Sequence, residues 1–491
     1  MNIFAESLKY FLDPRFVLLC GAGSVAGLFV GAVPGLSVSM ATALLVSLTY
    51  SWETRDALAA VMGVYVTGVF SGALSAILLN IPGAPSSVVT TLDGYPMAKR
   101  GEAFRALKYA VVYSFVGSVF GLLALALLAA PITSIALRFQ PMDYFLLALF
   151  GLTTVGGLTS GSFARGLAGA VFGLFFSLIG MDSVLGTPRL TFGIRALNAG
   201  INTVPALIGL FGFAEVLSVV YEGCPEAEQN SMTRQEVPLK EILRELPRSM
   251  YYCLIGTLVG ALPGAGGPVA SFLAYGQAKK LVKHPSRPFG EGAVEGITAS
   301  ESANNACIGG ALIPMLTLAV PGDAVTAIIL SVFYVHGLQP GPMFLTTNAE
   351  SFHVILGGGF ISCVFLLLLG LLAAPHLAGV INVPKKTLMP VVAMLCAVGA
   401  FGCRGRLFDV SVMLFFGVLG FLMRIREYPV APMTLALVLG GMMDSNFRRA
   451  VSLASSEDHM IMAMFGRPIT MVLLVLTVIS LAAGAGAGKR G

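Results

Sequence analysis

Hydrophobic residues run along this chain in long, continuous stretches rather than in alternation with polar ones. No Asp, Glu, Lys or Arg occurs from Ala110 to Leu137 or from Ser351 to Pro384. About 20 consecutive apolar residues are enough for a helix to cross a bilayer, and the lack of alternation argues against a membrane barrel. The pattern therefore predicts an all-α polytopic membrane protein with roughly ten to twelve transmembrane helices.

The composition agrees with this prediction and excludes several functional classes. Of the 491 residues, 56% are hydrophobic and 11% are charged, whereas soluble proteins have about 25% charged residues. The seven cysteines show no CxxC spacing and the five histidines no HExxH pattern, so neither a disulfide framework nor a structural metal site is expected. Neither a Walker A sequence nor GxSxG is found. We therefore expect a protein that is not an enzyme and has no cofactor.

Helix-breaking Pro-Gly pairs recur in the same order in both halves of the chain. GAVPGL at residues 31–36 matches GALPGA at 260–265, and Pro82-Gly83 matches Pro321-Gly322. Two motifs in the same order indicate an internal repeat. We place repeat one at about residues 16–130 and repeat two at about 250–375.

The charges of the loops predict that these repeats are inverted. Lysine and arginine accumulate in cytoplasmic loops. The loop after the second pair in repeat one carries Lys99, Arg100, Arg105 and Lys108, whereas its counterpart at 331–352 has no Lys or Arg. Between the two pairs the bias reverses, with Arg55 in repeat one against Lys279, Lys280, Lys283 and Arg287 in repeat two. Equivalent loops are therefore expected on opposite sides of the membrane.

This organisation predicts a secondary transporter. We expect a first membrane half at residues 1–220, a polar connecting loop at 221–249 and a second membrane half at 250–491. Inverted repeats with helices broken at corresponding positions are typical of transporters whose binding site lies near the bilayer midplane. A break survives in hydrocarbon only where it faces protein or a cavity, and the helix N-termini that it creates attract anions.

The densest polar cluster surrounds the second Pro-Gly pair of repeat two, in EGITASESANNACIGGALIPMLTLAVPGDAVTAIIL at residues 295–330. Glu301 and Asn305 are four residues apart and share one face of a helix. Carboxylates inside a membrane usually have a function, whereas single Ser or Thr residues more often bond helices together. Asp323 either ligates a cation or caps the helix after the Pro-Gly pair. The glycines of PGAGGP serve either helix packing or close approach of a ligand.

A shortage of basic residues adds a constraint on any anionic substrate. No Lys or Arg lies between Pro288 and Pro384. A bound anion would be neutralised by helix N-termini, by co-transported cations, or by a basic residue from elsewhere such as Arg165, Arg189 or Arg195. The alternatives are an ion channel, for which no filter motif is found, and an intramembrane enzyme, for which the two carboxylates lack a His or metal partner in the sequence.

The motifs GAVPGL, GALPGAGGPVASFLAYGQAK, the stretch 295–330 and PVAPMTLALVLGGMMDSNFRRAV (429–451) resemble a known family. The chain is similar over nearly its whole length to the large membrane subunit (TctA type) of the tripartite tricarboxylate transporters. The resemblance implies a small TctB-type membrane subunit and a periplasmic TctC-type solute-binding protein as partners. It also implies a multi-pass protein of the bacterial inner membrane that imports citrate or related carboxylates by secondary active transport, as a symport with Na⁺ or H⁺.

Two sets of site residues follow from the motifs and the resemblance. The expected substrate-binding residues are Pro34, Gly35, Ser37, Ser39, Pro82, Gly83, Ser86, Ser87, Pro263, Gly264, Gly266, Gly267, Ser302, Asn304, Asn305, Pro321 and Gly322. The expected ion-coupling residues are Glu301, Asn305, Asp323 and Thr326. No catalytic residue is expected, and sodium is the only metal ion considered. The repeat alignment places Gly63 and Ala84 opposite Glu301 and Asp323, so we expect the coupling chemistry mainly in repeat two.

Overall fold

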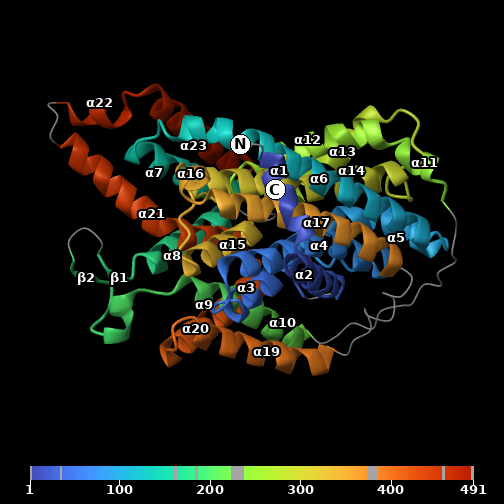
Figure 1. Cartoon of the computed structure of the whole chain (residues 1–491). Coiled ribbons are helices and arrows are strands. Elements are labelled where there is room, and N and C mark those ends of the chain that lie inside the picture. The colour runs from blue at the N-terminus through green and yellow to red at the C-terminus, as the bar shows by residue number, and fades with distance from the viewer. Residues whose placement is uncertain are drawn as a thin grey trace.

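Helices make up almost all of the computed structural model, which is shown in Figure 1. The structure describes residues 3–33, 36–158, 163–182, 186–222, 237–373, 385–455 and 459–487. Within these ranges the strands are β1 (Gly180–Met181) and β2 (Pro188–Arg189), which pair antiparallel in a short hairpin at the lower left of Figure 1. The all-α class predicted from the hydrophobic pattern is therefore confirmed.

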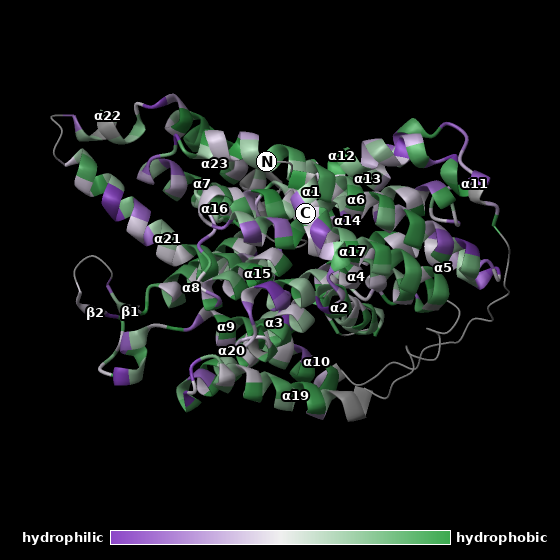
Figure 2. Ribbon diagram, viewed as in Figure 1, coloured by the Kyte–Doolittle hydropathy of each residue, from purple (hydrophilic) through white to green (hydrophobic). Residues whose placement is uncertain are grey.

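Many of these helices have the length and composition of membrane spans. Among the described residues, six helical segments are long and apolar enough to cross a bilayer, namely α2 (Pro14–Ala32), α4 (Thr54–Leu79), α6 (Ala103–Ala136), the segment Thr203–Tyr221, α17 (Ala349–Ala373) and α20 (Leu407–Ile425). Shorter apolar helices include α8 (Phe163–Ser177), α15 (Ala324–Val335), α19 (Lys385–Gly402) and α23 (Pro468–Ala487). Figure 2 shows hydrophobic residues along most of them. The protein is therefore a polytopic membrane protein.

The Pro-Gly pairs that the structure describes lie between helices, as predicted. Repeat one runs through α2, α3 (Val38–Leu48), α4, the 3₁₀ turn η2 (Pro85–Ser87) and α5 (Val88–Lys99). Repeat two runs through α12 (Leu246–Gly260), α13 (Gly266–Leu281), α14 (Val294–Leu318) and α15. Each repeat therefore has one break after its first helix and a second break after a long central helix.

The second break has the same backbone conformation in both repeats. Asn80 and Ala319 each stand two residues before the Pro-Gly pair, and both have a left-handed conformation, with φ values of 56° and 57°. The glycine that follows packs against the end of the first helix of its own repeat. A side chain at Gly83 would overlap the carbonyl oxygen of Gly31, and one at Gly322 would overlap that of Gly260. The internal repeat is thus a structural repeat.

The helix contacts also correct the sequence alignment by one residue. Gly27 of α2 lies against Val64 of α4, and the equivalent Gly256 of α12 lies against Ala303 of α14. Val64 therefore corresponds to Ala303, so Met62, rather than Gly63, is the counterpart of Glu301. The GAL triplets at 72–74 and 310–312 favoured the other register in sequence, but backbone contact at the glycines decides it.

Ion pairs show that the two repeats have opposite orientations. Arg15–Asp56 and Arg55–Asp13 hold the start of α2 beside the start of α4. The loop after α5 in repeat one lies instead beside the loop between α13 and α14 in repeat two, because Arg287 pairs with Glu102 through two bonds of 2.7 Å. These two loops are not equivalent in the repeat. Helix α5 runs in the same direction as α4, since Gly72 contacts Ser87 and Gly94 contacts Ile77, so α5 ends on the side opposite to the start of α4. The end of α5 therefore shares one face, which we call the basic face, with the start of α14, the counterpart of α4, and the repeats are inverted.

The central helix of each repeat packs against the last helix of the other repeat. Helix α6, the last helix of repeat one, packs on α14 of repeat two, and α17, the last helix of repeat two, packs on α4 of repeat one. Gly121 of α6 and Gly309 of α14 touch through their backbones, where a side chain on either would overlap the other helix. Helix α14 is buried along almost its whole length. The repeats therefore form one interlocked core.

The other helices surround this core. Helix α21 (Val430–Ala454) packs on α7 (Pro141–Leu158) and α8, α23 packs on α7, and α20 packs on the π-helical turn η4 (Ile208–Phe213). The remaining short helices are α1 (Ile3–Leu8), η1 (Lys9–Leu12), η3 (Arg195–Ala199), α9 (Thr203–Leu207), α10 (Ala214–Glu222), α11 (Leu239–Leu243), α16 (Phe344–Thr347) and α22 (Met460–Phe465). Helices α11 and α12 occupy part of the predicted loop 221–249, whose residues 223–236 lie outside the described ranges.

The inverted arrangement predicts the sidedness of single cysteines. Lys99 and Lys283 are exposed on the basic face, and Gln339 is exposed in the loop after α15. We expect cysteines at 99 and 283 to react with a membrane-impermeant maleimide only from the cytoplasm, and a cysteine at 339 only from the periplasm. Labelling of positions 99 and 339 from the same side would contradict the inverted topology.

Candidate functional site

The first helix turn of α13 brings the two repeats together at two neighbouring glycines. A Cβ atom on Gly266, which has a φ of +63°, would lie 3.2 Å from Cβ of Asp323, at the start of α15. A Cβ atom on Gly267 would overlap Oδ1 of Asn304 on α14 and lie 3.2 Å from Cβ of Ser86 in η2. We call Gly266, Gly267, Asn304, Asp323 and Ser86, together with Ser87 and Tyr65, the break cluster.

Asp323 has two structural roles within the break cluster. Its Oδ1 accepts hydrogen bonds from the backbone N–H of Thr326 at 2.7 Å and from Oγ1 of Thr326 at 2.8 Å, and Oγ1 of Thr326 lies 2.9 Å from the backbone N of Asp323. This capping box is the structural alternative considered for Asp323. Its Oδ2 accepts a bond of 2.9 Å from the hydroxyl of Tyr65, a fully buried residue of repeat one. Among the described residues, no Lys or Arg pairs with Asp323.

Tyr65 is a site residue that the sequence analysis missed. It occupies the position in α4 that Asn304 occupies in α14, because Val64 corresponds to Ala303. An alignment in the correct register would have placed a tyrosine opposite the asparagine. The polar end of each side chain faces the break cluster from its own repeat.

Two buried polar groups of the break cluster have no hydrogen-bond partner among the described residues. Nδ2 of Asn304 and Oγ of Ser87 are unpaired, and their residues are 2% and 0% exposed. Leaving such a group unpaired costs about 1–3 kcal/mol, so buried polar groups normally bond to protein, water or a ligand. Ser87 lies at the start of α5 and Asn304 beside the start of α13. Both groups can donate a hydrogen bond to an anion.

A second constellation lies on another face of α14. Glu301 is fully buried, and its carboxylate accepts from Oγ1 of Thr90 at 2.5 Å, from Oγ of Ser114 at 2.9 Å and from Nδ2 of Asn305 at 3.3 Å. Ser300 completes this Glu301 cluster through a contact of 3.2 Å with Thr90. The predicted shared face of Glu301 and Asn305 is therefore confirmed. Within the part of the chain that the structure describes, Oδ1 of Asn305 has no hydrogen-bond partner.

The Glu301 cluster also joins the two repeats. Thr90 comes from α5 and Ser114 from α6, both within repeat one. The described residues include no Lys or Arg that pairs with Glu301. The sequence offered only single hydroxyl residues in apolar helices as a signal for these two partners, and such residues are common in membrane helices.

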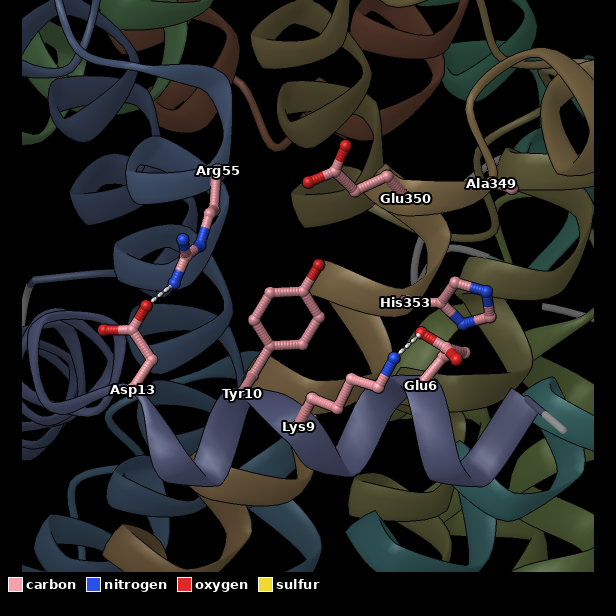
Figure 3. Close-up of a pocket in the computed structure, with 8 residues that line it drawn as sticks. All are labelled: Glu6, Lys9, Tyr10, Asp13, Arg55, Ala349, Glu350 and His353. Atoms are coloured by element: carbon pink, nitrogen blue, oxygen red, sulfur yellow. Dashed lines mark hydrogen bonds and ion pairs between the residues drawn. The ribbon is translucent and has the colours of Figure 1, made fainter.

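A separate cavity of about 440 Å³ opens beside the start of α17 and is shown in Figure 3. It is lined by Glu6, Lys9, Tyr10, Asp13, Arg55, Ala349, Glu350 and His353. Figure 3 shows that its two basic residues already face carboxylates, since Lys9 pairs with Glu6 at 2.6 Å and Arg55 pairs with Asp13. None of the predicted site residues lines this cavity. An incoming carboxylate would have to displace one of these ion pairs.

Comparison with known proteins identifies the family. The model of the family described as "Tripartite tricarboxylate transporter TctA family" matches residues 17–435. This chain belongs to the TctA family. A relative in Agrobacterium vitis, named as an uncharacterized 52.8 kDa protein in the TAR-I ttuC' 3'region, is 33% identical over 469 residues, or 95% of this chain and 92% of the relative. A second, from the TAR-II ttuC' 3'region, is 34% identical over 203 residues, or 41% of this chain and 83% of that protein. No solved structure matches.

Membership of the TctA family agrees with the fold. The matched residues include both repeats, the break cluster and the Glu301 cluster. The chain is thus a multi-pass membrane protein of a transporter family rather than of an enzyme family. The name of the family refers to a tripartite transport system.

Some predicted site residues of this TctA protein serve packing or capping. Oγ of Ser37 accepts from the backbone N–H of Met40 at 3.1 Å and caps α3, and Ser39 lies in the first turn of that helix. Gly264, with a φ of +76°, donates its N–H to the carbonyl of Gly322 at 2.7 Å. Pro82, Gly83, Pro263, Pro321 and Gly322 have no hydrogen-bonding side chain and could contribute only backbone groups. Oγ of Ser302 is buried and has no hydrogen-bond partner among the described residues, and Pro34 and Gly35 lie outside those residues.

The three arginines considered as outside partners do not reach either cluster. Arg165 pairs with Glu427 at 3.1 Å, Arg189 pairs with Asp444 at 3.0 Å, and Arg195 is exposed in η3. Ion pairs or solvent thus account for all three.

The contact between Gly267 and Asn304 gives a direct test of the break cluster. We expect Gly267→Ala to displace the Asn304 amide and reduce transport at least about tenfold, while the protein still folds because the amide is the end of a flexible side chain. Gly276→Ala on the same helix is the control, since no atom lies within 4 Å of its added Cβ. The initial uptake rates of both variants would measure transport, and their thermal unfolding would show whether each is folded. Equal uptake by the two variants would contradict the assignment.

Proposed function

We propose that this chain is the large transmembrane subunit of a binding-protein-dependent secondary transporter that imports tricarboxylates or related carboxylates. Its partners would be a TctB-type small membrane subunit and a TctC-type periplasmic solute-binding protein, in the bacterial inner membrane. Family membership supports the transport role. One observation carries the site: the starts of α13 and of η2–α5, from opposite repeats, meet at Gly267 beside the unpaired amide of Asn304.

Carboxylate recognition at this site would rely on hydrogen bonds rather than on ion pairs. The first backbone N–H groups of a helix have no partner within the helix, and the N-terminus carries about half an elementary positive charge. Helix α13 and the η2–α5 segment would supply such groups, with Nδ2 of Asn304 and Oγ of Ser87 as side-chain donors. Such a set of donors would bind a substrate carboxylate without the help of a Lys or Arg side chain.

Co-transported cations would complete the neutralisation. The break cluster and the Glu301 cluster each hold one carboxylate among neutral oxygen atoms, from Tyr65 and Thr326 in the first and from Thr90 and Ser114 in the second. Hard cations prefer such oxygen ligands, and a proton would also remove the cost of a buried charge. We propose Asp323 and Glu301 as the two coupling carboxylates, with Na⁺ or H⁺ as the ion.

Both clusters lie between repeats, which suits alternating access. Asp323 bonds to Tyr65 of repeat one, and Glu301 bonds to Thr90 of repeat one. A movement of one repeat against the other would change these bonds and the exposure of the site together. Binding of substrate and cation would thereby be coupled to the conformational change.

Reconstitution tests the proposed function. We expect the chain, together with its two partner subunits in proteoliposomes, to accumulate a carboxylate only under an imposed sodium or proton gradient and without ATP. A panel of tricarboxylates, dicarboxylates and aromatic acids under each gradient would identify substrate and ion. Ungated flux of inorganic ions would favour the channel alternative, and chemical turnover by the purified chain would favour the enzyme alternative.

The substitution Asp323→Asn separates coupling from capping. Asparagine caps a helix almost as well as aspartate, so the folded protein should persist while the charge is lost. We expect the cation concentration for half-maximal uptake to rise at least several-fold, or uptake to be abolished. Glu301→Gln should have a similar effect, whereas Glu350→Gln, outside both clusters, should leave the cation dependence unchanged. An unchanged dependence in D323N would leave Asp323 as a cap only.

A further inference from the structure

Helices α11 and α12 present an outward stripe whose chemistry changes along its length. Exposed residues recur every three or four positions, as on one face of a helix. The stripe starts with Lys240, Leu243 and Arg244, continues through Arg248 and Tyr251, and ends with Leu254 and Leu258. Leu243, Tyr251, Leu254 and Leu258 are 46%, 43%, 47% and 60% exposed. The stripe is basic at one end and aliphatic at the other.

Contacts on the inner side of α11 hold the basic residues outward. Glu241 accepts from Arg105 at 2.5 Å and from the hydroxyl of Tyr109 at 3.2 Å, both on α6. Ile242 is buried, and its carbonyl accepts from the hydroxyl of Tyr113. Lys240 and Arg244 lie one helical turn apart on the other side, and no carboxylate of the described residues pairs with either.

A surface hollow of about 790 Å³ surrounds these two residues. It is lined by Pro238, Lys240, Glu241, Leu243 and Arg244. Figure 2 shows α11 at the right-hand edge of the molecule, with hydrophilic residues near it and hydrophobic residues along α12. The hollow thus combines two unpaired cations with an adjoining apolar surface.

The order of residues along the stripe follows the cross-section of a lipid leaflet. Basic residues belong at the headgroups, tyrosine at the interface and leucine in the hydrocarbon. Arg244 stands in the turn before α12, and Leu254 lies eight residues beyond the first residue of that helix, which is about 12 Å along it. The Arg105–Glu241 ion pair ties α11 to the start of α6, on the basic face. Anionic lipids attract basic residues at the cytoplasmic surface.

We propose that Lys240 and Arg244 bind the phosphate of an anionic phospholipid, whose acyl chains lie along Tyr251, Leu254 and Leu258. One amphiphile satisfies both the unpaired charges and the exposed apolar residues, whereas a soluble phosphate would leave the leucines uncovered. The lipid would brace α12, which leads directly into the break at residues 261–265. This site is independent of the identity of the transported substrate.

A fluorescent reporter in the stripe tests the proposal. Trp52 is the single tryptophan of the chain, so Leu254→Trp in a Trp52→Phe background places one fluorophore beside the proposed acyl chains. We expect brominated phosphatidylglycerol to quench it with at least about threefold higher apparent affinity than brominated phosphatidylcholine in mixed vesicles. The further change Lys240→Gln with Arg244→Gln should abolish this preference.

The control removes the same charge elsewhere on the basic face. Lys280→Gln with Lys283→Gln removes two exposed lysines outside the hollow, and the preference for phosphatidylglycerol should persist. Equal quenching by the two lipids before any charge is removed would overturn the proposal, as would an equal loss in the control variant. The proposal would also be overturned if adding the small membrane subunit prevented both lipids from quenching the tryptophan, because the stripe would then be a protein interface.

Discussion

The broken helices impose the constraint on which the rest of this structure depends, because their free backbone groups must be satisfied away from water. The structure meets this constraint by packing the breaks of each repeat together. In repeat two, the N–H of Gly264 in the first break bonds to the carbonyl of Gly322 in the second. Glycine is required there because Gly322 touches the backbone of Gly260, and Gly83 touches Gly31 in the same way in repeat one. The breaks and their helix N-termini are thereby held inside the core.

This packing places two carboxylates in the core, and no Lys or Arg of the described ranges pairs with either of them. Asp323 and Glu301 both come from repeat two, while Tyr65, Thr90 and Ser114, which bond to them, come from repeat one. The site therefore exists only where the repeats meet. A neutral hydroxyl can stabilise a buried carboxylate but leaves its charge in place, which is why we propose these two carboxylates as the coupling groups.

The two repeats share a backbone and differ in chemistry. Asn80 and Ala319 have the same left-handed conformation, yet Asp323 stands where repeat one has Ala84. Tyr65 and Asn304 likewise occupy equivalent positions with different side chains. The two repeats thus have equivalent backbone breaks, whereas the carboxylates of both clusters come from repeat two alone.

The sequence by itself determined the all-α class, the inverted repeats and the shared face of Glu301 and Asn305, because hydropathy, loop charge and helical spacing are properties of short segments. Only the tertiary structure decided the register of the repeats, since Met62 rather than Gly63 stands opposite Glu301. It also decided that Tyr65 meets Asp323 and that Gly322 serves packing. These contacts join segments far apart in the chain, and they depend on single glycines at which two backbones come into contact. The local sequence pattern of either segment does not show which distant segment it will contact.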